Sequence, residues 1–277
     1  MATLLNGRAL AEQLLQELKL KTSALDFTPC LGVILVGDDP ASHLYVSLKE
    51  KAAAEVGISV NKIILPATAT LSQITGAVKT FNENANIHGI LVQLPLPAPL
   101  PEQTVINSID PNKDADGFHP LNLKKLTSGQ PSIIPGLSEG IIKLINLTGL
   151  ELKNKAVLIL ANSEEFSQPL SWLLGQLGLV VKTSLQPEAA ELLKADIIIV
   201  ALGQPEIITG QMAKDGTILI DVGTTKVNNQ LKGDIKAADF INRSVYLTPV
   251  PGGVGPMTVA MLLWNVYRLA INRQNST

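Results

Sequence analysis

The sequence has little cysteine and no clustered histidine. Of its 277 residues, only Cys30 is a cysteine, which excludes an intrachain disulfide framework and favours a reducing, cytoplasmic location. The three histidines, His43, His88 and His119, lie far apart and lack the spacing of metal ligands. We therefore expect no metal site.

The sequence also lacks an excess of positive charge and a long apolar run. Its net charge is −2, so nothing favours nucleic acid or an anionic membrane as a partner, and we expect neither. No uninterrupted apolar run approaches the roughly 18 residues needed to cross a bilayer. The first residues do not have the pattern of a signal peptide; they predict a helix with Leu10, Leu14 and Leu18 on one face.

What the sequence does contain is an alternation of apolar runs and helix-like segments. Runs at 30–37, 61–66 and 88–96 are apolar almost throughout, which is typical of parallel strands covered on both faces. After a polar stretch at 110–132 the alternation restarts. The second series of expected strands lies at 155–160, 179–184, 196–202 and 217–223.

This alternation predicts an α/β fold of two domains. Residues 1–137 form the first α/β domain, together with 247–277, whose long apolar helix returns to it. Residues 138–246 form a Rossmann-like domain with a doubly wound parallel sheet.

One helix-like segment, "PASHLYVSLKEKA", places Tyr45 and Lys49 four residues apart, so both lie on one helical face. A partly desolvated amine beside a phenol can have a lowered pKa and act as a proton carrier. The alternative is that Lys49 is an ordinary surface lysine in a charged run and Tyr45 a core residue.

Three further motifs carry polar groups to expected strand ends or rigid loops. Gln93 follows a buried strand, where it is either a strand-end hydrogen-bonding residue or a ligand contact. Asp114 and Asp116, two residues apart in "NKDADGF", could bind a cation or a heterocycle, although turn formation is their default role. The segment "TPVPGGVGPMT" (248–258) combines prolines and glycines in a rigid loop before a helix.

Taken together, these motifs closely resemble the methylenetetrahydrofolate dehydrogenase/methenyltetrahydrofolate cyclohydrolase (FolD-type) family. The resemblance runs from about residue 3 to residue 270. Its most specific segments are "PASHLYVSLKEKAAAEVGI", "GILVQLPLP", "NKDADGF", "IDVG" and "TPVPGGVGPMT".

The resemblance implies a role for each matching residue. Lys49 is the catalytic proton carrier, Tyr45 stacks on the folate, Gln93 tunes the lysine, and Asp116 holds the pterin ring. The remaining residues expected to line the folate pocket are Leu94, Pro251, Gly252 and Gly255. The resemblance further implies a cytoplasmic homodimer packed through its second domain, NADP as cofactor, and an active site in the cleft between the domains.

The expected nucleotide-binding turn departs from the family pattern, which is roughly Gly-Arg-Ser-x-Ile-Val-Gly-x-Pro. Ala161 and Ser167 replace its two glycines, and Asn162 replaces the arginine that holds the NADP 2′-phosphate. Ser163 and Pro169 are retained. We expect the cofactor, if bound, to contact Ala161, Asn162 and Ser163.

Two glutamates, Glu164 and Glu165, also enter this turn. A carboxylate about 5 Å from a phosphate costs around 3 kcal/mol at an effective dielectric constant near 20. Lys182, about 20 residues after the turn, could replace the missing arginine's charge. Thr224, after "IDVG", is the last expected contact.

Three interpretations therefore remain open. The first is the full bifunctional enzyme with NADP, or with NAD. The second is a cyclohydrolase whose dehydrogenase is either weak, or absent with no nucleotide bound. The third is a non-catalytic folate-binding paralogue.

Overall fold

The structure is a computed structural model that describes residues 1–228 and 230–274. The chain divides into two compact units. The three-stranded unit contains Glu12–Gly136 and the segment from Val259 onward. The six-stranded unit contains Met1–Ala11 and Leu137–Thr258.

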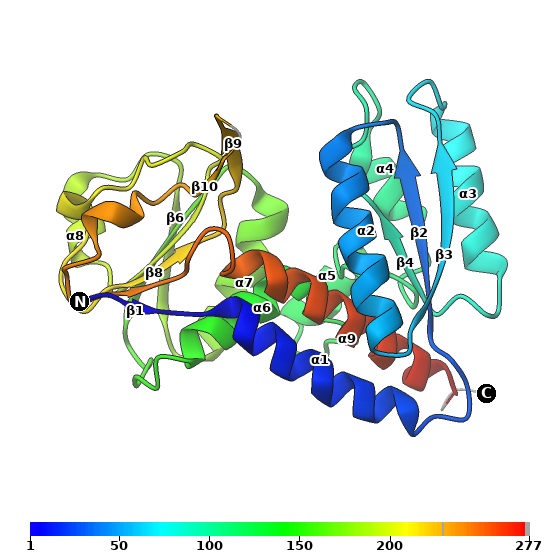
Figure 1. Cartoon of the computed structure of the whole chain (residues 1–277), viewed down its shortest axis with the longest axis horizontal. Coiled ribbons are helices and arrows are strands. Elements are labelled where there is room, and N and C mark those ends of the chain that lie inside the picture. The colour runs from blue at the N-terminus through cyan, green and yellow to red at the C-terminus, as the bar shows by residue number, and fades with distance from the viewer. Residues whose placement is uncertain (229, 275–277) are drawn as a thin grey trace. The chain divides into compact units, whose positions relative to one another are not determined.

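The three-stranded unit is built on a parallel sheet of order β3-β2-β4 (Figure 1). Its strands are β2 (Cys30–Val36), β3 (Ser59–Leu65) and β4 (Gly89–Val92). Its helices are α2 (Pro40–Glu55), α3 (Leu71–Glu83), α4 (Glu102–Asn107), α5 (Pro120–Thr127), most of α1 (Gly7–Ser23) and most of α9 (Val254–Gln274).

Both faces of the central strand β2 are buried, as the sequence predicts. Leu31, Val33 and Leu35 join a core with side chains of α1, α2 and α9. Ile34 and Val36 alternate with them and join a second core with side chains of α3. The period of two along the strand therefore divides one apolar run between two helical layers.

The long helix α9 owes its apolar composition to this core. Among the described residues it is the one helix long and apolar enough to cross a membrane, but 56% of that window is buried. The Trp264 indole N–H donates to the Leu14 carbonyl oxygen of α1 at 3.2 Å. Asn265 donates to the carbonyl oxygens of Ala115 and Ile134. The predicted return of this helix to the first domain is confirmed.

The six-stranded unit, in which Figure 1 labels β1, β6 and β8, contains a parallel sheet of order β1-β11-β8-β7-β5-β6. Its strands are β1 (Thr3–Leu4), β5 (Ala156–Ala161), β6 (Val180–Ser184), β7 (Ile197–Ala201), β8 (Ile218–Asp221) and β11 (Tyr246–Leu247). Its helices are α6 (Gly136–Asn146), α7 (Glu164–Gln176) and α8 (Ala189–Lys194), with short 3-10 turns at Gly210–Met212 and Ala237–Asp239.

This order, in which β5 lies between β6 and β7, is the crossover arrangement of a nucleotide-binding sheet. On one face, Leu158, Leu160, Ile198 and Val200 pack with Leu192 of α8. Helix α7 contacts β5 and β6. The predicted two-domain α/β architecture is confirmed.

Four local features differ from the sequence-based expectations. Residues 3–4, expected to lead into a helix, form the edge strand β1, so the structure places Met1–Ala11 with the six-stranded unit. Residues 247–258, expected to belong to the first domain, are also part of the six-stranded unit. Strand β11, at the start of this segment, pairs with β8. The polar stretch contains α5, and an antiparallel hairpin of β9 (Thr225–Val227) and β10 (Gln230–Lys232) was not expected.

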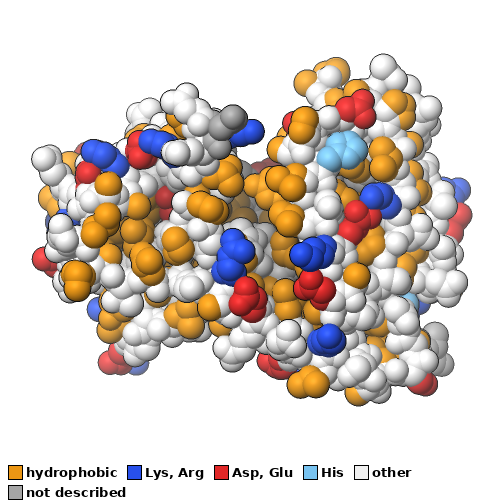
Figure 2. Space-filling model, in the orientation of Figure 1, with side chains coloured by type: hydrophobic (Ala, Val, Ile, Leu, Met, Phe, Trp, Pro, Cys, Tyr) orange, Lys and Arg blue, Asp and Glu red, His pale blue; other side chains and the backbone are white. Residues whose placement is uncertain are grey.

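Charged side chains of both signs are interspersed over the face shown in Figure 2. Several pair locally, for example Lys62 with Glu50 at 2.6 Å and Lys232 with Glu206 at 2.8 Å. Such pairs balance charge over short distances.

Two glycines of the three-stranded unit provide a matched test of this packing. A Cβ on Gly32 of β2 would lie 2.7 Å from the buried ring of Phe81, whereas a Cβ on Gly76 of α3 would meet nothing within 4 Å. We expect Gly32→Ala to destabilise the protein by about 1–3 kcal/mol through overpacking. We expect Gly76→Ala to stabilise it by about 0.5–1 kcal/mol, because alanine loses less backbone entropy in a helix.

Urea unfolding followed by circular dichroism gives both values. Effects of equal sign in the two variants would contradict the assigned packing of α3 on β2.

Candidate functional site

The candidate site of the three-stranded unit is organised around the ammonium group of Lys49 on α2. Asp39 caps this helix by accepting a hydrogen bond from the Ser42 backbone N–H at 2.8 Å, and Pro40 occupies its first position. Lys49 is half-buried, and its Nζ donates to Oε1 of Gln93 at 2.8 Å. The structure thus brings together two predicted site residues from separate elements.

Gln93 is held in place from both sides. It follows β4 directly, and its backbone N–H donates to the Ile34 carbonyl oxygen of β2 at 2.9 Å. Its side-chain Nε2 donates to the carbonyl oxygen of Leu94 at 2.6 Å. With its amide nitrogen engaged, Gln93 presents its oxygen to Lys49. Gln93 is 9% exposed, so this contact lies at the edge of the core.

Asp114 and Asp116 have different surroundings. Asp114 is buried and accepts hydrogen bonds from the backbone N–H groups of Gly117 and His119 and from the Asn122 side chain. This is the turn-forming role expected by default. Asp116, in contrast, is half-buried and interacts electrostatically with Lys49.

The loop that carries these aspartates is fixed by Lys113. Its buried ammonium donates to the carbonyl oxygens of Phe81, Asn82 and Asn84 at 2.9, 2.7 and 2.8 Å. These carbonyls lie at the C-terminal end of α3, where a helix favours a cation. The sequence analysis did not single out Lys113, although it stands within the motif "NKDADGF".

Burial and charge shift the pKa values of the Lys49–Asp116 pair in opposite directions. Desolvation lowers the pKa of Lys49, and the nearby Asp116 carboxylate partly counters this effect. Desolvation raises the pKa of Asp116 to about 6; Lys49 opposes the shift and Asp114 adds to it. A lower pKa makes the neutral, proton-accepting form of an amine more accessible.

Tyr45 lies one helical turn before Lys49 and is 41% exposed. Its ring is therefore open to a ligand. The alternative interpretation, in which Tyr45 is a core residue, does not agree with this exposure. The structure thus places Tyr45, Lys49, Gln93, Leu94 and Asp116 in the same unit.

The glycine-rich loop at 248–258 belongs to the six-stranded unit. Gly252 has a φ of +111°, which favours glycine, and its carbonyl oxygen accepts from the Arg8 backbone N–H at 2.9 Å. A Cβ on Gly255 would meet nothing within 4 Å. Pro251 is exposed beside them. How this loop contributes to folate binding stays a prediction.

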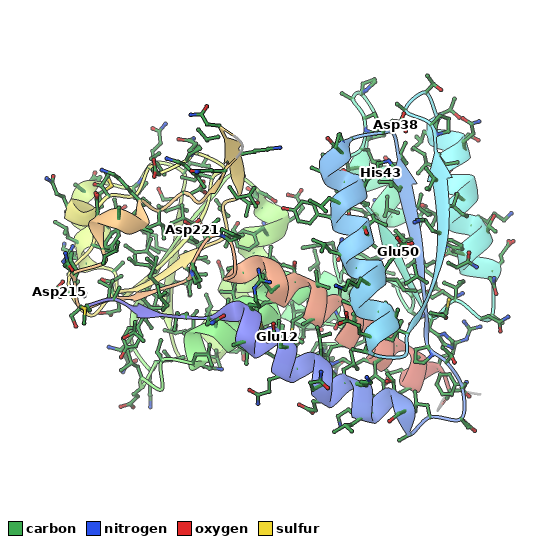
Figure 3. The ribbon with its side chains drawn as sticks, in the orientation of Figure 1. Glu12, Asp38, His43, Glu50, Asp215 and Asp221 are labelled. Atoms are coloured by element: carbon green, nitrogen blue, oxygen red, sulfur yellow. The ribbon has the colours of Figure 1, made fainter. Side chains whose placement is uncertain are left out.

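Sequence reasoning missed a buried pair of aspartates at the carboxyl edge of the six-stranded sheet. Asp221 ends β8 (Figure 3), and its carboxylate accepts from the backbone N–H groups of Gly223, Asp234 and Ile235. Asp234 accepts from the N–H groups of Leu202 and Gly203, while its Oδ1 is buried without a hydrogen-bond partner.

The aspartate pair joins the loops that follow β7 and β8. Desolvation raises the pKa of Asp221 to about 6; backbone hydrogen bonds oppose this shift and Asp234 adds to it. Only "IDVG" signalled Asp221, and no motif signalled Asp234. Thr224, an expected cofactor contact, is exposed in the loop after β8.

The expected nucleotide-binding turn has the predicted strand–turn–helix context. Strand β5 ends at Ala161, the exposed Asn162 follows, and Ser163 caps α7 by accepting from the Phe166 backbone N–H at 3.3 Å. The Ser163 hydroxyl donates to Oε2 of Glu165 at 2.8 Å. Glu165 therefore already occupies a donor that a phosphate would use at this helix end.

The first turn of α7 stabilises the ionised form of Glu165. Hydrogen bonds from the Glu165 backbone N–H and from Ser163 hold the pKa of this carboxyl below its usual range. The exposed Glu164 accepts from the Gln168 side chain at 3.2 Å.

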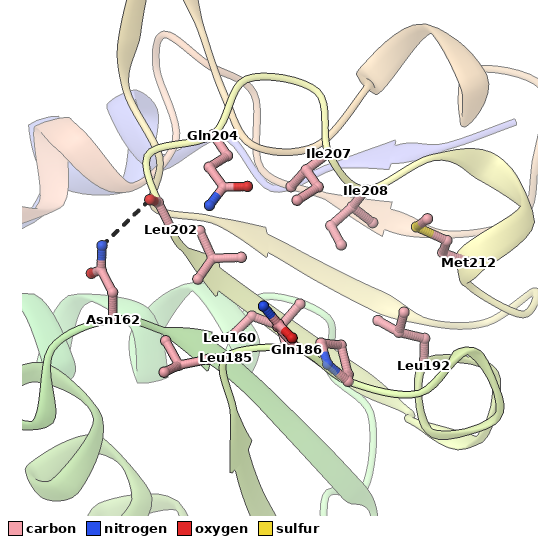
Figure 4. Close-up of a pocket in the computed structure, with 11 residues that line it drawn as sticks. Leu160, Asn162, Leu185, Gln186, Leu192, Leu202, Gln204, Ile207, Ile208 and Met212 are labelled. Atoms are coloured by element: carbon pink, nitrogen blue, oxygen red, sulfur yellow. Dashed lines mark hydrogen bonds between the residues drawn. The ribbon is translucent and has the colours of Figure 1, made fainter.

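A pocket of about 440 Å³ lies at the carboxyl ends of β5, β6 and β7 (Figure 4). Figure 4 shows amide side chains facing it from the segments after these strands, with Asn162 bonded to the Leu202 carbonyl oxygen at 3.5 Å. Its lining residues are Leu160, Asn162, Leu185, Gln186, Pro187, Leu192, Leu202, Gln204, Ile207, Ile208 and Met212.

Lys182, expected near a ribose phosphate, forms an ion pair with Glu191 and is exposed. It is not among the residues that line the pocket.

The three histidines make structural hydrogen bonds. His43 Nε2 contacts the Gly37 carbonyl oxygen at 3.2 Å, His88 Nδ1 accepts from the Cys30 N–H, and His119 Nδ1 accepts from the Leu121 N–H. Across residues 1–228 and 230–274, no group of three or more histidine, cysteine, aspartate and glutamate side chains could hold a metal ion.

Two family models match the chain. The tetrahydrofolate dehydrogenase/cyclohydrolase catalytic domain matches residues 5–116, and the NAD(P)-binding domain of the same family matches residues 135–274.

Full-length relatives and solved structures agree with these matches. The bifunctional protein FolD of Geotalea daltonii is 40% identical over 280 residues, covering 99% of this chain and 100% of the relative. The FolD structure from Campylobacter jejuni has a TM-score of 0.93 at 38% identity, covering 99% of this chain and 100% of that one.

The Trypanosoma brucei FolD structure, a complex with NADP and an inhibitor, also has a TM-score of 0.93. It is 34% identical and covers 100% of this chain and 99% of that one. The identity extends over both units, so the catalytic and the NAD(P)-binding regions are both present. The chain belongs to the tetrahydrofolate dehydrogenase/cyclohydrolase family.

Proposed function

We propose that this protein interconverts 5,10-methylene-, 5,10-methenyl- and 10-formyl-tetrahydrofolate in one-carbon metabolism, as a dehydrogenase and cyclohydrolase. The full-length identity to FolD proteins supports both activities. The observation that carries the catalytic assignment is the 2.8 Å hydrogen bond between half-buried Lys49 and Gln93.

Lys49 performs the proton transfers of the cyclohydrolase step. Hydrolysis of the methenyl bridge requires a base to take a proton from water and an acid to protonate the leaving nitrogen. The lowered pKa of Lys49 makes its neutral, proton-accepting form more accessible, as a proton carrier requires. Gln93 fixes the direction of the amine because its own amide nitrogen is held by the Leu94 carbonyl.

Tyr45 and Asp116 position the folate in this proposal. The exposed ring of Tyr45 stacks on the folate's aminobenzoyl ring, one turn from Lys49. Asp116 holds the pterin and also supports the charged form of Lys49. Contacts to the folate from Pro251, Gly252 and Gly255 are expected from the family resemblance alone.

The nicotinamide dinucleotide, when bound, supplies hydride transfer to and from the one-carbon bridge. Residues of the six-stranded unit fit the adenosine of this dinucleotide better than its pyrophosphate. The pocket at the strand ends, with its aliphatic walls and amide side chains, suits an adenosine. The turn at 161–164 suits the pyrophosphate poorly, because it has no glycine and Glu165 already binds Ser163.

The finer predictions rest on the family resemblance. They are NADP or NAD as the dinucleotide, contacts from Ala161, Asn162, Ser163, Thr224 and Lys182, a homodimer, and a cytoplasmic location. Lys182 would have to leave Glu191 to reach a 2′-phosphate.

The second candidate function is a cyclohydrolase without dehydrogenase activity. The carboxylate at the first turn of α7 favours it, because the site for the pyrophosphate is already occupied by an anion. The folate-side geometry favours catalysis over a non-catalytic paralogue, since half-buried Lys49 is oriented by Gln93 and has a lowered pKa.

Two measurements on one preparation test the proposal. Methenyl-tetrahydrofolate hydrolysis is followed spectrophotometrically, and nucleotide binding by calorimetry. Hydrolysis together with dinucleotide binding supports the bifunctional enzyme. Hydrolysis without binding selects the cyclohydrolase, and absence of both contradicts the proposed function.

Replacing Lys49 tests its role as proton carrier. We expect Lys49→Ala to lower cyclohydrolase kcat by about 10²–10⁴-fold while folate binding persists. Lys49→Arg should be similarly impaired, because a guanidinium does not release its proton. The matched control is Lys51→Ala, which removes an exposed lysine from the same helix and should leave turnover unchanged.

Steady-state kinetics gives kcat, and equilibrium titration with a folate gives the binding constant. Turnover near the wild-type level in either Lys49 variant would refute the assignment.

Asp116→Asn tests the coupling within the pair. The ionised Asp116 carboxylate raises the pKa of Lys49, so its removal should lower that pKa further. Because Asp116 titrates at about 6, the difference from wild type should appear above about pH 6 and vanish below it. The limb of the pH profile of kcat/KM that reports Lys49 should move to lower pH.

If Asp116→Asn loses turnover, an NMR titration of the labelled Lys49 amine gives its pKa directly. A pKa that is unchanged or higher than in wild type would contradict the predicted coupling.

A further inference from the structure

The pocket at the ends of β5, β6 and β7 has no charged side chain in its lining. Eight of its lining residues are apolar, and three carry amides: Asn162, Gln186 and Gln204. An amide offers both donors and acceptors, which suits a hydroxyl group, whereas a phosphate dianion requires cations or several donors.

The position of the pocket identifies the part of the dinucleotide concerned. In a sheet of this topology the ribose 2′ position is read about 20 residues after the turn, at the end of the second strand. That strand is β6, and the residues that follow it, Leu185 and Gln186, line the pocket. Asn162 approaches from the turn after β5 (Figure 4).

Charged residues close in sequence to Asn162, Leu185 and Gln186 do not favour a phosphate. Lys182 on β6 is bound to Glu191, so its charge is already balanced. Glu164 and Glu165 follow Asn162 and are both exposed. A 2′-phosphate would therefore enter next to carboxylates without gaining a cation, whereas a 2′-hydroxyl would lose nothing.

We infer that this pocket selects a nicotinamide dinucleotide with a free 2′-hydroxyl, that is NAD, over one with a 2′-phosphate, NADP. Asn162 and Gln186 are the residues that determine this preference. The inference rests on the proposed function and refines the cofactor of its dehydrogenase step.

Calorimetric titration of the full-length protein tests the preference without requiring turnover. We expect NAD to bind at least tenfold more tightly than NADP. Adenosine 5′-monophosphate should likewise bind more tightly than adenosine 2′,5′-bisphosphate, because the two ligands differ only at the 2′ position. NADP binding equal to or tighter than NAD binding would overturn the inference.

Asn162→Arg places a cation in the pocket lining and should shift the NAD-to-NADP affinity ratio at least tenfold toward NADP. Gln168→Arg is the matched control. It adds the same charge to the exposed face of α7 outside the pocket lining, and should leave the ratio unchanged. An equal shift in both variants would overturn the inference, because it would reflect net charge alone.

Lys182→Ala tests the remaining alternative, in which Lys182 binds the 2′-phosphate of NADP. A selective loss of NADP affinity would show that Lys182 holds the 2′-phosphate and would overturn the inference; an unchanged ratio supports it. Hydrolysis of methenyl-tetrahydrofolate in the same preparations reports separately on the proposed function. Binding of neither dinucleotide with hydrolysis intact would overturn the inference and select the cyclohydrolase.

Discussion

The proposed chemistry of this protein depends on one amine kept partly out of water and pointed in one direction. Lys49 reaches Gln93 at 2.8 Å because α2 and the end of β4 pack on the same strand, β2. Desolvation lowers the lysine pKa, and Asp116 limits how far it falls. The opposing effects keep the amine able to change protonation state, which a fully solvated lysine near its usual pKa does poorly.

The expected nucleotide-binding turn of the six-stranded unit shows a different arrangement of charges and hydrogen bonds. The helix α7 begins directly after β5, as a phosphate-binding helix should, yet its first-turn donors serve Glu165. Asp221 and Asp234 accept hydrogen bonds from backbone N–H groups and so connect the loops after β7 and β8. The strand–turn–helix context of a dinucleotide site is thus present, while Glu165 engages the Ser163 hydroxyl at the start of the helix. The uncharged pocket beside it is the basis of the inferred preference for NAD.

Local sequence patterns predicted several features of the fold and of the candidate site. The run at Cys30–Val36 predicted a strand buried on both faces, and Leu31 and Ile34 do enter different cores. The spacing of Tyr45 and Lys49 placed them on one helical face. Local patterns did not predict elements that depend on pairing between distant segments. Strand β1, for example, has only two residues and is a strand because it pairs with β11. Asp234 gave no sequence signal, because its partners Leu202 and Gly203 are about 30 residues away.

The sequence by itself determined the alternation of strands and helices, the family, and the side chains available for proton transfer, because these depend on periodicity and residue identity. Only the tertiary structure decided which of two aspartates forms the turn and which faces Lys49. It also decided that Glu165 folds back on Ser163 and that the pocket at the strand ends is uncharged. Desolvation and hydrogen-bond geometry arise from residues distant in the chain, so no local pattern encodes them.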